Sequence, residues 1–159
     1  MDTKNIQRIC GGCTACCKSI AVIEIDKPLG KWCQYCSIGR GCLMYAEKPA
    51  SCTEFRCEWL KGFGEEKHRP DRTKIILDYT KLVKGGLPGG ILQVWEVSEG
   101  SLGNAHVKKT TLFALENEIW VAHFPLRGSR SIFVPRSQIV TEEIALVFVE
   151  NNIAVTDWP

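Results

Sequence analysis

Cysteine is absent from the second part of the sequence, and long hydrophobic runs are absent throughout. All nine cysteines of the 159-residue chain lie between residues 10 and 57. No apolar run approaches the ~20 residues that a transmembrane helix needs, so we expect no membrane partner. Residues 1–10 lack the apolar core of a secretory signal, which makes the cytoplasm the expected compartment.

Strong charge of one sign and catalytic signatures are also lacking. The formal net charge is +2 and the lysines and arginines are scattered singly, so we expect no nucleic-acid partner. The three histidines lie far apart, and neither a His-Glu-x-x-His pattern, a Gly-x-Ser-x-Gly elbow nor a dinucleotide fingerprint occurs. The sequence therefore offers no catalytic residue and no cofactor-binding residue other than metal ligands. It favours a protein that is not an enzyme.

What the chain has instead is a dense cysteine pattern. Thiolates two residues apart can turn inward on one tight loop and hold a soft metal ion. Gly11 and Gly12 permit the sharp turn that such a loop needs. An odd number of cysteines, an adjacent Cys16–Cys17 pair and a reducing cytosol favour metal ligation over disulfides. The candidate metal ligands are Cys10, Cys13, Cys16, Cys17, Cys33, Cys36, Cys42, Cys52 and Cys57.

The spacing leaves the metal open between zinc and iron. Structural zinc takes four ligands, so the cysteines can serve two separate ions or a shared cluster of three. Three cysteines at two-residue gaps also suit a [4Fe–4S] cluster, with a distant cysteine as the fourth ligand. The Cys-Pro ending of the ferredoxin pattern is absent, so we favour Zn²⁺ and keep [4Fe–4S] as the alternative. Cys17 ranks last among the ligands, because it cannot easily face the same ion as Cys16.

Composition predicts an α+β protein in two parts that pack as one compact unit. Residues 1–61 form a loop-rich cysteine module that binds metal. Residues 62–73 are rich in glycine, charge and proline and are interpreted as a linker. Residues 74–159 are interpreted as a small mixed α/β layer that supplies the core.

Short apolar runs predict the elements of each part. In the cysteine module we expect an extended segment at 19–26, a helical turn at 43–48 and a helix at 52–61. In the second part we expect a helix from Asn104 to Leu115, with Asn104 as its N-cap. Residues 83–90 are interpreted as a strand connector, because no Gly-Lys-Ser/Thr follows its glycines. Strands are expected at 75–79, 91–97, 118–124, 131–134 and, in preference to a buried helix, at 144–150.

The order of the cysteines resembles that of the CxxCxxCC, or YkgJ-type, cysteine-cluster family. The matching residues are Cys10, Cys13, Cys16 and Cys17, then Cys42-Leu43-Met44-Tyr45, then Lys48-Pro49-x-x-Cys52-x-x-Phe55-x-Cys57. Lys48-Pro49 stands where the family usually shows Arg-Pro. The resemblance implies a zinc- or iron-chelating domain, which also occurs in flagellin lysine methylases. It does not imply methylation, because the chain has no separate methyl-donor-binding motif.

Two classes of function follow. In the first, the protein is a metal-stabilised binding or regulatory module, which the lack of a catalytic constellation favours. In the second, it is an iron–sulfur protein with a redox or catalytic role. The expected partner is the metal ion. A protein partner is left open, and no residue identifies it.

Overall fold

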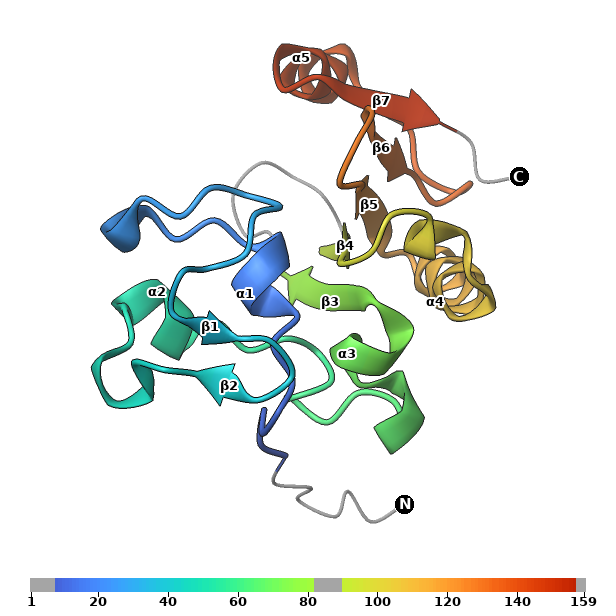
Figure 1. Ribbon diagram of the computed structural model, residues 1–159. Helices are drawn as coiled ribbons and strands as arrows, with labels where there is room; N and C mark the ends of the chain where they lie inside the picture. Colours follow the sequence, from blue (N-terminus) through green and yellow to red (C-terminus); the bar gives the residue numbers. More distant parts are fainter. Residues whose placement is uncertain (1–7, 82–89, 157–159) are drawn as a thin grey trace.

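Five strands in the second part of the chain form one mixed sheet (Figure 1). In the computed structural model, which describes residues 8–81 and 90–156, their order is β3-β4-β5-β6-β7. The pairs β3–β4 and β5–β6 are antiparallel, whereas β4–β5 and β6–β7 are parallel. The strands are β3 (Ile75–Thr80), β4 (Ile91–Glu96), β5 (Trp120–Phe124), β6 (Arg130–Phe133) and β7 (Ile153–Thr156).

Alternation of side chains gives the sheet two apolar faces. Along β4, buried Leu92 and Val94 alternate with half-buried Ile91 and Trp95, as a strand with a side-chain period of two requires. Helix α4 (Ala105–Glu116) covers the first face, where its Val107 packs in one cluster with Leu92 and Val94. This cluster is the largest part of the core.

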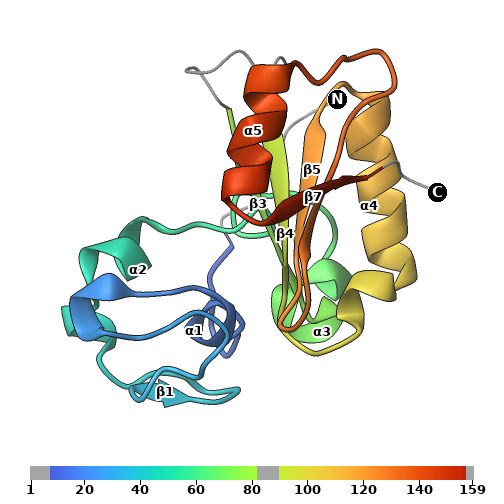
Figure 2. The ribbon, with the colours of Figure 1, turned by 90° about the horizontal axis from the view of Figure 1, so that it is seen from above.

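The second face is covered by helix α5 and by the cysteine module. Phe148 of α5 (Glu142–Glu150) packs on Trp120 and Ile132 of the sheet. Figure 2 shows α4 on one side of the sheet, with α5 and the cysteine module on the other. The protein contains helices together with a five-stranded mixed sheet and a two-stranded sheet, which confirms the predicted α+β class.

The cysteine module is built from short elements, none longer than the five residues of α2. Its strands β1 and β2 form a small antiparallel sheet. Two more short elements, η3 (Glu66–His68) and α3 (Pro70–Thr73), precede β3, and η4 (Ser101–Gly103) precedes α4. The module contains α1 (Cys16–Ser19), η1 (Ile23–Ile25), β1 (Cys36–Ser37), β2 (Gly41–Cys42), η2 (Tyr45–Glu47) and α2 (Ala50–Glu54).

Most elements predicted for the second part are confirmed. Strands β3, β4, β5 and β6 occur where apolar runs predicted them, and β5 and β6 pair in antiparallel orientation. Asn104 caps α4, because its side-chain oxygen accepts a hydrogen bond from the Val107 amide at 2.8 Å. Residues 83–89 of the predicted connector lie outside the described residues.

The strand predicted at 144–150 is wrong, because this run lies in α5. The Thr141 hydroxyl accepts a hydrogen bond from the Ile144 amide and begins the helix. Strand β7, which the sequence analysis missed, then pairs in parallel with β6. Parallel neighbours need a crossover connection, and the helix provides it.

Two predictions for the cysteine module are also wrong. Residues 19–26 are not extended, because α1 ends at Ser19 and η1 follows, with one isolated bridge between Val22 and Lys27. The helix predicted at 52–61 is limited to α2, which ends where the Phe55 backbone becomes extended. Phe55 then packs on the Ala15–Ile76 cluster against the sheet. The predicted helical turn at 43–48 is confirmed as η2.

Among the aromatic side chains of the five-stranded sheet, Trp120 and Phe133 are buried. Trp95 and Phe124 are half-buried and stack on each other with ring centroids 3.9 Å apart. Among the described residues, no helix is long and apolar enough to cross a membrane.

Candidate metal centre

Most of the cysteines lie around one cavity in the cysteine module. The cavity has a volume of about 130 Å³, and its remaining walls are largely apolar, with Val22, Phe55 and Ile76 among them. Eight cysteines far apart in sequence therefore face a shared space. They are Cys10, Cys13, Cys16, Cys17, Cys33, Cys42, Cys52 and Cys57.

The first cysteine loop is held against the turn between β1 and β2 by a close backbone approach. A side chain at Gly12 would place its Cβ 2.7 Å from the carbonyl oxygen of Gly39. The Thr14 hydroxyl accepts a hydrogen bond from the Gly39 amide at 3.1 Å. Gly12 is therefore needed for packing, in addition to the loop flexibility that the sequence suggested.

The loop also turns back on itself and binds the second cysteine segment. The Cys13 amide donates to the Cys10 carbonyl at 2.9 Å, which closes the first turn. The Cys33 amide donates to the Cys17 carbonyl, also at 2.9 Å. Across the small sheet Cys36 pairs with Cys42. These contacts bring three cysteine-bearing stretches together without a regular element longer than one helical turn: residues 10–17, 33–36 and 42.

Cys36, the remaining cysteine, does not line the cavity but adjoins it. Its side chain is hydrogen-bonded to the thiol of Cys17, which is also bonded to Cys16. Cys17 therefore connects Cys36 with the cavity. This position fits the expectation that Cys17 differs from its neighbour Cys16.

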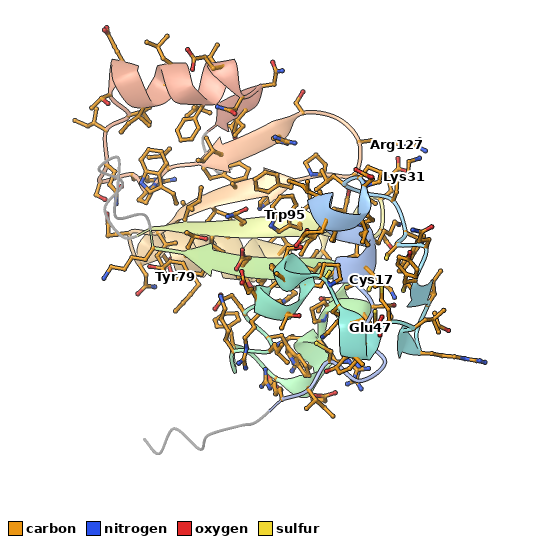
Figure 3. All side chains as sticks on the ribbon, turned by 90° about the vertical axis from the view of Figure 1, so that its left-hand side faces the viewer. Cys17, Lys31, Glu47, Tyr79, Trp95 and Arg127 are labelled. Atoms are coloured by element: carbon orange, nitrogen blue, oxygen red, sulfur yellow. The ribbon has the colours of Figure 1, made fainter. Side chains whose placement is uncertain are left out.

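The sheet forms one wall of the cavity. Ile76 of β3 lines the cavity and is 1% exposed, and it clusters with Ala15 and with the partly buried Cys13 and Cys57. Downstream of Cys57, the Glu58 amide donates to the Leu77 carbonyl at 2.8 Å and fixes this segment on β3. Figure 3 labels Cys17 on α1, which lines the cavity, and Trp95 on β4, which packs in the same cluster as Ile76.

Burial makes most of these thiols harder to ionise. It raises the pKa of Cys57 to about 11, and neighbouring cysteines add to the shift. The pKa values of Cys10, Cys13, Cys36 and Cys52 are raised for the same first reason, desolvation. Without a cation in the cavity, most of the thiols are therefore protonated. A coordinated metal ion would reverse this, because it deprotonates a thiol outright.

The pKa of Cys16 shifts in the opposite direction. The thiol of Cys17 donates a hydrogen bond to Cys16, which lowers the pKa of Cys16 to about 7 and raises that of Cys17. Cys16 is therefore the cysteine of the pair that ionises first, and Cys17 keeps its proton. This asymmetry distinguishes two adjacent cysteines that are identical in the sequence.

The donor set fits a soft metal, although the thiols do not converge on one point. Tetrahedral zinc with Zn–S bonds of about 2.3 Å needs sulfurs about 3.8 Å apart. Within residues 8–81 and 90–156, no group of three or more His, Cys, Asp or Glu side chains is placed to hold an ion. All-thiolate donors are nevertheless the preferred ligands of zinc and of iron–sulfur clusters. Metal binding would therefore require the thiols to move toward the centre of the cavity.

None of the three histidines lines this cavity. His68 and His106 stack on each other with ring centroids 4.2 Å apart, in a separate small pocket beside Trp59. His123 lies in the sheet, where its Nε2 is 3.1 Å from the Thr111 hydroxyl. Their placement agrees with packing roles. Sequence reasoning missed Lys27, whose buried position beside the cysteines has no sequence signature.

Comparison of the chain with protein-family models, with curated proteins and with solved structures gave no match. The likeness to the cysteine-cluster family therefore rests on the quoted residues alone. What the site can do must be inferred from its own geometry and chemistry.

Proposed function

We propose that this protein binds a soft metal in the cysteine cavity, and that the metal stabilises the module as a binding or regulatory unit. The observation that carries the proposal is that eight cysteines line one cavity. Their spacing in sequence is irregular, so a shared cavity is a property of the fold and not of a single motif. The resemblance to zinc- or iron-chelating cysteine-cluster domains supports the same proposal.

The shared cavity favours one centre over two separate ones. Two isolated zinc sites would each enclose four sulfurs around its own ion. Here the thiols face a common space, and Cys17 contacts both a cavity cysteine and Cys36. A cluster in which some thiolates bridge two Zn²⁺ ions uses this arrangement best.

A structural role for the metal is favoured by the architecture around the cavity. The module has short elements and few buried apolar side chains, so ligation would add the folding free energy that packing does not. The cavity walls otherwise consist mostly of apolar groups, with no histidine. Besides the cysteines, the titratable side chains that line the cavity within the described residues are Tyr45 and Lys48.

The alternative is a [4Fe–4S] cluster with a redox or catalytic role. The observation that favours it is the volume of about 130 Å³, which gives room for a group of several atoms. When bound, such a cluster supplies electron transfer at a potential that its surroundings adjust. The same cysteines would hold it, since both centres use thiolate ligands.

Anaerobic purification followed by elemental analysis tests the proposal. We expect more than one zinc ion per chain, or iron with equal acid-labile sulfide and a brown colour that bleaches in air. A Cys16→Ser, Cys33→Ser double variant should lose most of the metal. The control is Asp78→Ala, which removes a half-buried carboxylate of β3 outside the cavity wall. A folded wild-type chain that takes up neither zinc nor iron would contradict the proposal.

A further inference from the structure

A lysine is buried beside the cysteine cavity. Lys27 is 6% exposed, whereas Ile23 in the same turn is 86% exposed. The chain folds back here through two backbone hydrogen bonds, from the Val22 amide to the Lys27 carbonyl at 2.9 Å and in return at 3.0 Å. Asp26 adopts a positive φ of 50° to complete the turn. The fold thus places a charged side chain inside and an apolar one outside.

The ammonium group is fixed by backbone oxygens. Its Nζ donates to the carbonyl of Lys18 at 2.8 Å and to the carbonyl of Ile20. These bonds use two of the three N–H donors of a lysine. Both acceptors follow the adjacent cysteines of α1, so the positive charge is held at a set position next to that pair.

Carboxylates do not balance this charge. None of the ion pairs formed within the described ranges includes Lys27. Its pKa is lowered by burial, and the cysteines, Cys33 and Cys17 foremost, oppose that shift. An unpaired buried charge is costly, so a counter-charge is expected close by.

The thiols are the groups that can supply it. A metal ion bound in the cavity would hold its cysteine ligands as thiolates. A zinc ion with four thiolate ligands carries net negative charge, and so does a thiolate-bound iron–sulfur cluster. Lys27 and a loaded cavity therefore balance each other.

We propose that Lys27 is the internal counter-ion of the metal–thiolate centre. It is a positioning residue that stabilises the charge of the centre through space and does not ligate the metal. This inference rests on the proposed metal-binding function. It adds that affinity for the metal depends on a buried positive charge that the cysteine pattern does not contain.

Three substitutions separate charge from hydrogen bonding. Lys27→Arg keeps the positive charge, Lys27→Gln keeps N–H donors without charge, and Lys27→Met keeps only the apolar stem. Lys31→Gln, at an exposed lysine labelled in Figure 3, is the matched control. The probe is Zn²⁺ itself, titrated into the reduced full-length chain in competition with a chromophoric chelator.

We expect Lys27→Gln and Lys27→Met to weaken Zn²⁺ binding alike, by about tenfold or more, as groups outside the ligand shell commonly do. Lys27→Arg and Lys31→Gln should bind like the wild type. A Lys27→Gln variant that fails to fold in the presence of Zn²⁺ shows a structural anchor and counts against the inference. If the chain is instead loaded with a [4Fe–4S] cluster, loss of the charge should lower its reduction potential.

Other outcomes overturn the inference. If Lys27→Gln binds like the wild type while Lys27→Met does not, the lysine serves as a hydrogen-bond donor only. If Lys27→Arg loses as much Zn²⁺ affinity as Lys27→Gln, Lys27 acts as a steric anchor. If all three variants bind Zn²⁺ with wild-type affinity, Lys27 has no role in metal binding. In each of these cases the wild type still binds Zn²⁺. A wild type that binds no metal contradicts the proposed function as well.

Discussion

The sheet half and the cysteine module use different means to hold a fold. In the sheet half, Val94, Val121 and Ile132 are fully buried and the longest helix has twelve residues. In the module, elements have at most five residues, and Leu43 and Tyr45 are 74% and 67% exposed. Periodic apolar side chains build a core in the first case. In the cysteine module, by contrast, the cysteine thiols surround a cavity that no apolar side chain fills.

Because the cysteine module has few buried apolar side chains of its own, it packs against apolar side chains of the sheet half. Ile76 of β3 lines the cysteine cavity, and Val97, just after β4, packs with Ala15 and Ile20 of the module. Apolar side chains of the module are therefore buried against apolar side chains of the sheet half. We expect the sheet half to tolerate loss of the metal, and the module to depend on both the metal and the sheet.

Val94→Asp should have the largest effect. Val94 is 0% exposed in β4, between β3 and β5, so a carboxylate there is buried without a partner. We expect a loss of more than about 4 kcal/mol of unfolding free energy, enough to unfold the sheet. Urea unfolding monitored by tryptophan fluorescence measures it. The control is Val155→Asp, at a residue 43% exposed on β7; similar stability of the two variants would contradict the packing described here.

Acid should destabilise the sheet half independently of the metal. Burial lowers the pKa of His123 to about 4, whereas an unfolded histidine titrates near pH 6.5. Between these values unfolding takes up a proton, so the unfolding free energy falls as the pH falls. His123 contributes its full stability above about pH 6.5 and loses about 3 kcal/mol by pH 4. Denaturant midpoints of wild type and His123→Gln at both pH values measure this; equal slopes with pH would contradict it.

Substitutions of Cys13 and of Cys17 should weaken Zn²⁺ binding to different extents. Cys13 lines the cavity and packs in the cluster with Ala15 and Ile76, whereas Cys17 shares hydrogen bonds with Cys16 and Cys36. We expect Cys13→Ser to weaken Zn²⁺ binding by at least about tenfold, or about 1.4 kcal/mol, and Cys17→Ser to do so by less. Metal content after dialysis against a chelator measures both. Equal losses would contradict the ranking.

The N-cap of α4 should give the smallest effect of the four. Asn104 accepts from the Val107 amide at 2.8 Å and donates to the Thr73 carbonyl at 3.1 Å. Loss of a helix N-cap costs about 1 kcal/mol, so Asn104→Ala should lower the unfolding free energy by about that amount. Thr141→Ala in α5, where the capping bond is 3.4 Å, should cost less in the same denaturant assay. The reverse order would contradict the capping geometry.

The sequence predicted the sheet half better than the module, for physical reasons. Strands β3 to β6 and helix α4 follow from local periodicity and from the cap at Asn104. The run at 144–150 was misread, because its apolar residues fit two periods and the crossover to β7 is a non-local requirement. Within the module the cysteines were identified by spacing, but their common cavity depends on backbone contacts such as Gly12 against Gly39. The buried position of Lys27 depends on a turn that no local pattern encodes.

Amide hydrogen exchange on one sample, with metal bound and after chelation, tests the central proposal most directly. Two amides report on the module: Cys33, bonded to the Cys17 carbonyl, and Gly39, bonded to the Thr14 hydroxyl. Amides of β4 and β5 serve as the internal control. We expect chelation to abolish protection in the module while the central strands keep theirs. Unchanged protection of Cys33 and Gly39, once metal has demonstrably been bound and removed, would contradict the role of the metal in holding this fold.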